Sequence, residues 1–214
     1  MSVRRPLDVG VDRLKGIIGD MAAASTEAFR RSMESIFSGE DASEDVRMLS
    51  DQLQFMREEA GQLAVELIAR FQPVATDLRR IRSCLQVSYD FSRIGRYSLD
   101  ICETSILVPM MGCDFSKLKQ LYIIVLYMVR EVGRAFIFED LELAKKVRDL
   151  DDDVDALYNE YLRGLMRDGR KDNPACLVSG TLILRHLERI ADHACYIADS
   201  VSYIRTGSLE LERE

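Results

Sequence analysis

The sequence predicts an all-α protein made of two tandem three-helix bundles, with six helices and an internal pseudo-repeat. Residues that interrupt helices are scarce, with four prolines and twelve glycines in 214 residues. Apolar residues recur at alternating steps of three and four along much of the chain. The two halves of the chain also align with each other. Together these observations predict a duplicated helical bundle.

Three long apolar stripes mark helices that bury one face. The stripes are Val46, Leu49, Leu53, Met56, Ala60, Leu63 and Leu67; Leu143, Val147, Leu150, Val154, Leu157 and Tyr161; and Leu187, Ile190, Ala194, Ile197, Val201 and Ile204. A stripe that keeps this period over several turns is typical of the buried seam of a bundle. We therefore expect each stripe to face a shared core.

Turn-forming residues divide the chain between these stripes. The expected helices span residues 8–38, 42–70, 73–109, 114–139, 141–168 and 174–206. Pro73 is expected in the first turn of the third helix, where its missing N–H has no helical partner to lose. Pro109 separates the two halves, and Asn173 followed by Pro174 opens the last helix.

The internal repeat has a period near 100 residues. Arg93 aligns with Arg189 at an offset of 96, and Leu53 aligns with Val154 at an offset of 101. A period of this length with three helices in each unit predicts two similar bundles. The expected repeats are residues 1–109 and 110–214.

Charge and hydropathy exclude two classes of partner. The net charge is −7 and the chain has no Lys/Arg-rich block, so direct nucleic-acid binding is not expected. The longest apolar run, LYIIVLYMV at 121–129, is about half of the ~20 residues that a transmembrane helix needs. No apolar segment follows the arginines of MSVRR, so no secretory signal is expected. We expect a cytoplasmic protein with no transmembrane segment.

The cysteines and histidines give little indication of chemistry. Cys84, Cys102, Cys113, Cys176 and Cys195 are odd in number, contain no Cys-x-x-Cys pair and lie mostly at apolar helical positions. We expect them to be reduced core residues.

The only histidines, His186 and His193, are seven residues apart and are expected on a partly exposed flank. Neither has glutamate three residues before it, which argues against a ferritin-like di-iron site.

Two pairs of acids stand out against this background. Glu188 and Asp192 lie one helical turn apart in RHLERIADH (185–193), although like charges at that spacing repel. One interpretation is a solvated face on which Arg185 and Arg189 absorb the repulsion. The other is a face that binds a ligand, since both acids lie roughly 100° to 140° around the helix from Leu187 and so outside the apolar seam.

A second pair has the same spacing in the preceding helix. Asp151 and Asp155 belong to the acidic run DLDDDVD at 149–155. If the fifth and sixth helices are antiparallel neighbours, both pairs meet in the outer groove between them. Carboxylates without histidine or thiol suit a hard cation such as Mg²⁺, Mn²⁺, Ca²⁺ or iron, with zinc as a further candidate. The alternative is a plainly solvated acidic face. Nucleophile, phosphate-loop and HExxH motifs are absent, so no catalytic residue is predicted.

Several segments resemble the PhoU family of phosphate-uptake regulators. They are FQPVATDLRRI (71–81), DDDVDALY (151–158), RHLERIADHACYIADSV (185–201) and YIRTG (203–207). The resemblance implies two similar three-helix bundles side by side and a homodimeric regulator without catalysis of its own. It also implies negative control of a phosphate ABC transporter at the cytoplasmic membrane face, and in many bacteria of its sensor histidine kinase.

The resemblance further implies a surface metal site with an acid-x-x-x-acid motif in each repeat. In this chain the motif falls on Asp151, Asp155, Glu188 and Asp192, with Fe, Zn, Mg or Mn as the candidate cation. The first repeat departs from the motif, because Arg96 stands where Asp192 stands in the second. Ser92, Ser50 and Gln54 replace the other three acids, so we expect no metal in the first repeat.

Three other functions remain open from the sequence. The chain could be the accessory protein of a low-affinity phosphate permease, since the fold and the acidic motifs of that related family overlap with those of PhoU. It could also be a helical scaffold or oligomerisation protein unrelated to phosphate. A carboxylate-metal enzyme is the third, although no nucleophile or proton-shuttling group accompanies the acids.

Overall fold

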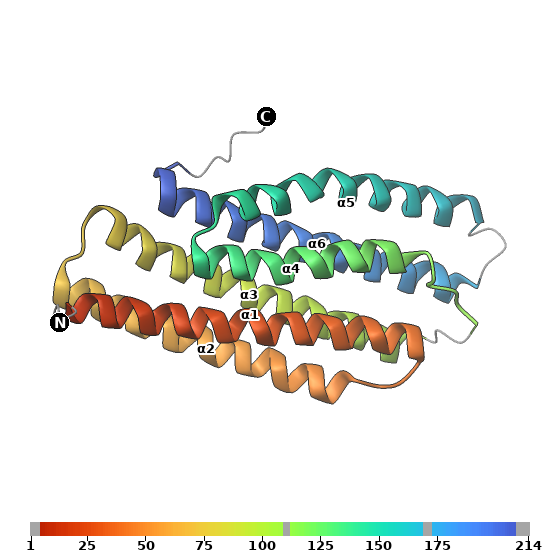
Figure 1. The fold of residues 1–214 in the computed structure, drawn as a ribbon. Coiled ribbons are helices and arrows are strands. Elements are labelled where there is room, and N and C mark those ends of the chain that lie inside the picture. The colour runs from red at the N-terminus through yellow and green to blue at the C-terminus, as the bar shows by residue number, and fades with distance from the viewer. Residues whose placement is uncertain (1–4, 109–111, 169–172, 209–214) are drawn as a thin grey trace.

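A computed structural model describes residues 5–108, 112–168 and 173–208. Its helices are α1 (Pro6–Ser38), α2 (Ser43–Phe71), α3 (Ala75–Leu107), α4 (Leu118–Phe138), α5 (Leu141–Asp168) and α6 (Pro174–Thr206). These described ranges contain no strand, and each expected helix is present (Figure 1). The prediction of an all-α fold is confirmed.

Two helices begin later than expected. Pro73 lies before α3 rather than in its first turn, so that prediction was wrong. The reason is the reversal between α2 and α3: Gln72 adopts a left-handed conformation (φ 47°) and Val74 is extended (φ −127°, ψ 165°). Before α4, the Asp114 side chain accepts a hydrogen bond from the Ser116 amide at 2.9 Å, and the helix starts at Leu118. The expected divider, Pro109, lies outside the described residues.

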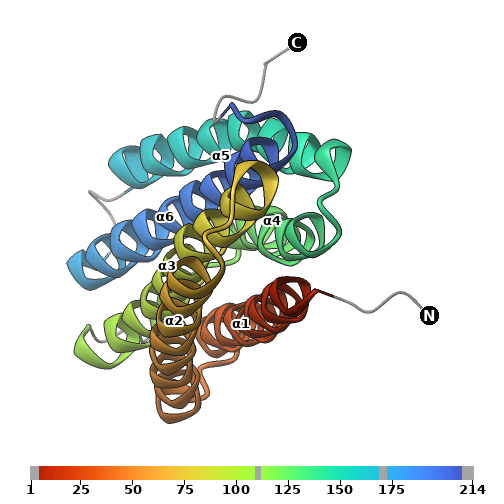
Figure 2. The same cartoon turned by 90° about the vertical axis from the view of Figure 1, so that its left-hand side faces the viewer.

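The helices form two bundles that pack side by side. Helices α1, α2 and α3 contact one another, and α4, α5 and α6 form the second group (Figure 1). The groups meet where α1 lies along α4 and α3 lies along α6, while α2 and α5 lie at the far edges (Figure 2). Helices α3 and α6 are antiparallel, because Ser83 contacts Ser200 and Asp90 contacts His193.

One hydrophobic core runs through both bundles. Its buried members come from all six helices and include Leu14, Leu53, Phe91, Met128, Val147 and Ile190. The predicted seams face this core: α6 buries its whole stripe, and α2 and α5 bury or half-bury theirs. Burial of these stripes stabilises the fold, at roughly 25 cal/mol for each Å² of apolar surface removed from water. The helical periodicity thus correctly identified the residues inside.

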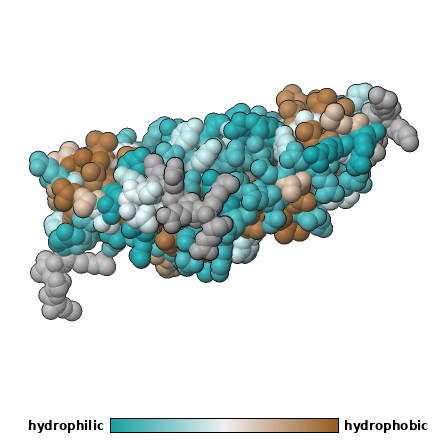
Figure 3. Space-filling view, turned by 90° about the horizontal axis from the view of Figure 1, so that it is seen from above, coloured by the Kyte–Doolittle hydropathy of each residue, from teal (hydrophilic) through white to brown (hydrophobic). Residues whose placement is uncertain are grey.

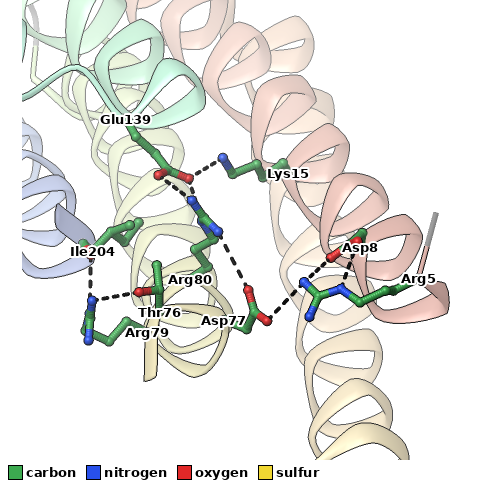
Figure 4. Close-up of polar contacts among 9 residues, drawn as sticks. All are labelled: Arg5, Asp8, Lys15, Thr76, Asp77, Arg79, Arg80, Glu139 and Ile204. Carbon is green, nitrogen blue, oxygen red and sulfur yellow. Dashed lines mark hydrogen bonds and ion pairs between the residues drawn. The ribbon is translucent and has the colours of Figure 1, made fainter. Parts of the chain in front are cut away.

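A polar junction joins the two bundles at the end of α4 (Figure 4). The Glu139 carboxylate accepts hydrogen bonds from Arg80 of α3 (2.8 and 3.0 Å) and from Lys15 of α1 (2.5 Å). Its side chain is only 8% exposed. Burial raises the pKa of the Glu139 carboxyl, but the hydrogen bonds from Arg80 and Lys15 outweigh burial and hold the pKa at about 2. Three helices are therefore held together by one ionised carboxylate.

The cysteines differ from expectation at two positions. Cys113 and Cys176 form a disulfide that ties the segment before α4 to the first turn of α6, with Cα atoms 5.3 Å apart. The prediction that all five are reduced is wrong for this pair, because the fold brings together residues that are 63 positions apart. Cys84, Cys102 and Cys195 are free and buried, as expected.

Within the described ranges, no helix combines the length and the apolarity that crossing a bilayer requires.

Candidate functional site

The four predicted metal ligands lie on the neighbouring helices α5 and α6. Asp151 and Asp155 are one turn apart on α5, and Glu188 and Asp192 are one turn apart on α6. The two helices pack against each other, as the sequence predicted. Asp151 lies close enough to Asp192 for its charge to raise the pKa of that carboxyl. The structure therefore brings one acid of each pair together across the interface.

Burial and like charge make two of these carboxylates costly to ionise. The pKa of Glu188 is raised by burial first and then by the charge of Asp192. Burial also raises the pKa of Asp192, while Arg189 lowers it and Asp151 raises it. A cation held between such carboxylates would favour their ionised forms.

Arginines supply that positive charge in the structure. Arg185 contacts Glu188 at 2.8 Å, and Arg189 contacts Asp192 at 3.4 Å. On α5, Arg148 lies 3.9 Å from Asp151. The structure therefore contains the ion pairs that a solvated face predicts. They lie on the same face as the acids expected to bind a cation. The two interpretations are compatible.

The four acids, as the structure places them, do not form a group that could hold a metal ion. Among the residues that the structure describes, no three acidic, histidine or cysteine side chains are placed closely enough to hold a metal ion. Asp155 is exposed, and its backbone carbonyl accepts a hydrogen bond from the Asn159 side chain at 2.8 Å. The surface seen from above Figure 1 is mostly hydrophilic along its middle, and the apolar patches lie toward its two ends (Figure 3). The predicted ligand set stays a prediction.

The first bundle presents different chemistry at the corresponding positions. Arg96 is exposed and pairs with Asp100 at 2.8 Å and with Glu103 at 3.5 Å. The Ser92 hydroxyl donates to the Tyr89 carbonyl at 2.7 Å. These contacts place a cation and a backbone-bonded hydroxyl where the second bundle has two carboxylates. The expectation of no metal in this repeat stays a prediction.

A buried polar pair joins α3 to α6 and was missed by sequence reasoning. His193 Nδ1 lies 2.8 Å from the Asp90 carboxylate, which is fully buried and also accepts a hydrogen bond from Gln86 at 3.2 Å. The pKa of Asp90 is raised by burial, although its hydrogen bonds to His193 and Gln86 oppose the shift. The expectation of an exposed flank was wrong for His193, because its face of α6 packs on α3. The sequence feature that could have indicated this pair is Asp90 itself, an acidic residue that lies between the apolar residues Val87 and Phe91.

His186 lies about two helical turns before His193 on α6 and is half-buried. Its Nδ1 atom is buried and has no hydrogen-bond partner among the described residues. Burial lowers the pKa of His186, with a smaller opposing effect from Asp100. The ring lies beside Tyr97, with centroids 5.9 Å apart. The expectation of partial exposure holds for this histidine.

Comparison with known proteins shows similarity over almost the whole chain. A chain named phosphate-specific transport system accessory protein PhoU homolog 1, from Thermotoga maritima, is 30% identical over 200 residues, which cover 91% of this chain and 86% of the relative. A homologue from Zymomonas mobilis is 27% identical over 214 residues, covering 98% of this chain and 90% of the relative.

Solved structures show the same fold. The phosphate transport system regulatory protein PhoU from Streptococcus pneumoniae superposes with a TM-score of 0.87 at 20% identity, covering 96% of this chain and all of the other. PhoU from Pseudomonas aeruginosa superposes with a TM-score of 0.75 at 27% identity, covering 94% and 96%. The family model described as PhoU domain matches residues 18–105 and 118–201, once in each bundle. The chain belongs to the PhoU family.

Proposed function

We propose that this protein regulates phosphate uptake, acting as a negative regulator of a phosphate ABC transporter through protein–protein contact. The observation that carries the proposal is the PhoU domain in each bundle, together with relatives that are named accessory proteins of phosphate-specific transport. In this proposal the protein works at the cytoplasmic membrane face as a homodimer, and a sensor histidine kinase is a second partner. No catalytic step is assigned to it.

The direct test is phosphate uptake in a strain that lacks the protein. With the gene deleted, uptake is expected to stay high at phosphate concentrations that normally suppress it, and the gene supplied in trans restores suppression. Unchanged uptake at every phosphate concentration contradicts the proposal and favours a scaffold unrelated to phosphate. A deletion effect that persists without the ABC transporter favours the low-affinity permease.

We also propose that Asp151, Asp155, Glu188 and Asp192 bind one divalent or iron cation. Support comes from their placement on adjacent helices and from the raised pKa values of Glu188 and Asp192. The metal content of untagged protein is the measurement, with the double variant Asp155→Ala/Glu188→Ala for comparison. Less metal is expected in the variant than in the native chain. Equal metal in both samples contradicts the site.

The Cys113–Cys176 disulfide bears on the proposed cytoplasmic location. A reducing cytosol keeps most protein thiols reduced. Alkylation of intact cells before lysis, followed by mass spectrometry, measures whether this pair is oxidised in its own compartment. A reduced pair is expected for a cytosolic protein, and a fully oxidised pair contradicts that location.

A further inference from the structure

Three arginine–tyrosine pairs lie along one face of α3 and involve its neighbours α2 and α6. We name them the arginine–tyrosine strip; they are Arg57 with Tyr89, Arg82 with Tyr203, and Arg93 with Tyr97. The guanidinium carbons lie 5.2, 4.5 and 4.7 Å from the respective ring centroids. Four of the members are at 82, 89, 93 and 97 on α3, a spacing that places them on one helix face. Helices α2 and α6 contribute the other two.

Within the described residues, the arginines of the strip form no ion pair with a carboxylate. None of Arg57, Arg82 and Arg93 forms an ion pair with a carboxylate in the described part of the chain, whereas Arg30 and Arg80 do. Arg93 donates a hydrogen bond to the Tyr97 hydroxyl at 2.8 Å, and Arg57 donates a long one to the Gln54 side chain at 3.5 Å. A guanidinium stacked on a ring keeps its N–H edge free for a planar anion and is held in place for it. The strip therefore presents positive charge in a chain of net charge −7.

The strip also has the composition of a protein-binding surface. Tyrosine and arginine are the residues most enriched among energetically dominant contacts. Tyr89 of the strip is 40% exposed. Tyr196 of α6 is not a member, but its ring packs edge-on against the same buried His193 as that of Tyr89, and it is 45% exposed. The hydrogen bond between His193 and Asp90 joins α6 to α3 beneath these rings. Rigid, half-exposed aromatic rings lose little conformational entropy when a partner covers them.

The shape of the surface selects a macromolecule over a small anion. Small ligands bind in concave pockets, and the main cavities of the described chain lie elsewhere. One of about 680 Å³ adjoins Tyr161 between α4, α5 and α6, and one of about 340 Å³ lies between α1 and α4 beside Gly133. A strip from Arg82 to Arg93 extends roughly 16 Å along the helix, at about 1.5 Å per residue. That length matches about three turns of a partner helix.

The charges around the strip select the class of macromolecule. Asp192 adjoins His193, whose ring contacts Tyr89 and Tyr97 of the strip, and the acidic run 149–155 belongs to α5, which packs on α6. A nucleic acid or an anionic membrane would meet this acidic border and be repelled. A partner helix that carries carboxylates along one edge only can turn that edge toward the arginines and away from the acids of α5 and α6.

We propose that the arginine–tyrosine strip is the docking surface for an acidic helical segment of a partner protein. The carboxylates of that segment pair with Arg57, Arg82 and Arg93, and its apolar side chains cover Tyr89 and Tyr196. This inference rests on the proposed function only in taking the partner to be a component of phosphate regulation.

The test measures binding of a fluorescent helical peptide of glutamate, alanine and leucine to the full chain by anisotropy. The double variant Arg57→Ala/Arg93→Ala is expected to bind about tenfold more weakly or worse. The control variant Arg13→Ala/Arg70→Ala removes the same charge from exposed residues that are paired elsewhere, and it should bind like the native chain. Arg57→Lys/Arg93→Lys should fall between, because lysine keeps the charge and loses the planar N–H edge.

Several outcomes overturn the proposal. Equal binding by the two alanine double variants would show that net charge alone is responsible. Equal or tighter binding of a lysine peptide, of single-stranded DNA or of anionic vesicles would identify a different occupant. Circular dichroism melts of each variant exclude unfolding as the cause of lost binding. If the peptide fails while gene deletion still deregulates uptake, the surface is wrong and the proposed function stands.

Discussion

Two buried carboxylates, Asp90 and Glu139, are held by different chemistry. Glu139 accepts charged hydrogen bonds from Arg80 and Lys15, and the pKa of its carboxyl is lowered to about 2. Asp90 has a histidine and an amide as partners, and burial raises the pKa of its carboxyl. Ionisation of Glu139 therefore stabilises the fold, whereas ionisation of Asp90 costs stability.

Glu139→Gln is expected to lower the free energy of unfolding at pH 7 by about 3 kcal/mol, because a pKa shift from 4.5 to about 2 is worth that much at roughly 1.4 kcal/mol per unit. The folded-state pKa lies below the unfolded one. The difference between native and variant chains is therefore fully present above about pH 4.5 and is lost as the pH falls toward 2. Urea unfolding across this range measures it. Glu142→Gln, at an exposed position, is the control and should change little.

Asp90 tests whether its hydrogen bond or its charge matters. Asp90→Ala leaves His193 Nδ1 buried without its acceptor and should cost about 2 to 4 kcal/mol of unfolding free energy. Asp90→Asn keeps an acceptor oxygen and removes a charge that burial disfavours, so it should cost about 1 kcal/mol or less. Denaturant unfolding at pH 7 compares the variants. Equal destabilisation by both would show that the charge of Asp90 is required.

At the scale of elements, small residues set the distance between α1 and α4. A Cβ atom on Gly133 would lie 2.8 Å from the Ala22 Cβ, and neither of these short side chains can move aside. The two helices therefore depend on glycine to approach each other at the junction of the bundles. At Gly61 on α2, by contrast, an added Cβ meets no atom within 4 Å.

Gly133→Ala should destabilise the protein by about 1 to 3 kcal/mol, because separating α1 from α4 outweighs the better helix propensity of alanine. Gly61→Ala should stabilise it by about 0.5 to 1 kcal/mol, since only propensity changes there. Thermal and denaturant unfolding of the two variants give the values. A stabilising Gly133→Ala would show that the helices do not need this close approach.

The disulfide constrains the end of the second bundle at which α4 and α6 begin. Closing a loop across a separation of 63 residues stabilises by about 4 kcal/mol in the chain-entropy model, and engineered cases often give less. Purified, air-oxidised protein unfolded without reductant should therefore titrate as three free thiols, those of Cys84, Cys102 and Cys195. Cys113→Ser should lower the unfolding free energy as much as Cys113→Ser/Cys176→Ser. Five titratable thiols would show that the bond is absent.

At the scale of the whole molecule, the two repeats share one core. Helices α1 and α3 each bury apolar residues against α4 and α6 of the other repeat. An isolated repeat would expose that surface to water. Stability is thus a property of the pair of bundles and not of either one.

The shared core predicts a single cooperative unfolding transition for the full chain. Circular dichroism and tyrosine fluorescence should report the same midpoint, because neither bundle keeps its core after the other unfolds. Residues 1–109 or 110–214 expressed alone should be partly folded or aggregate. Two separated transitions, or a soluble and cooperative half, would show that the repeats are independent domains.

The sequence alone determined the six helices, their inward faces and the repeat. These features depend on local periods of three and four residues, which Leu53 in α2 and Ile190 in α6 follow as the structure places them. It also placed the acid pairs of α5 and α6 on adjacent helices, because a short connection leaves successive helices antiparallel. Where the geometry of a turn determines a helix boundary, as at Pro73 before α3, the boundary predicted from the sequence was wrong.

Only the tertiary structure decided which distant residues meet. Asp90 and His193 are 103 positions apart, Lys15 and Glu139 are 124 apart, and the disulfide joins cysteines 63 apart. A periodic pattern states which face of a helix is buried but not which face of another helix covers it. That choice depends on how the side chains of two bundles interlock, so the polar pairs and the arginine–tyrosine strip emerged only from the packed helices.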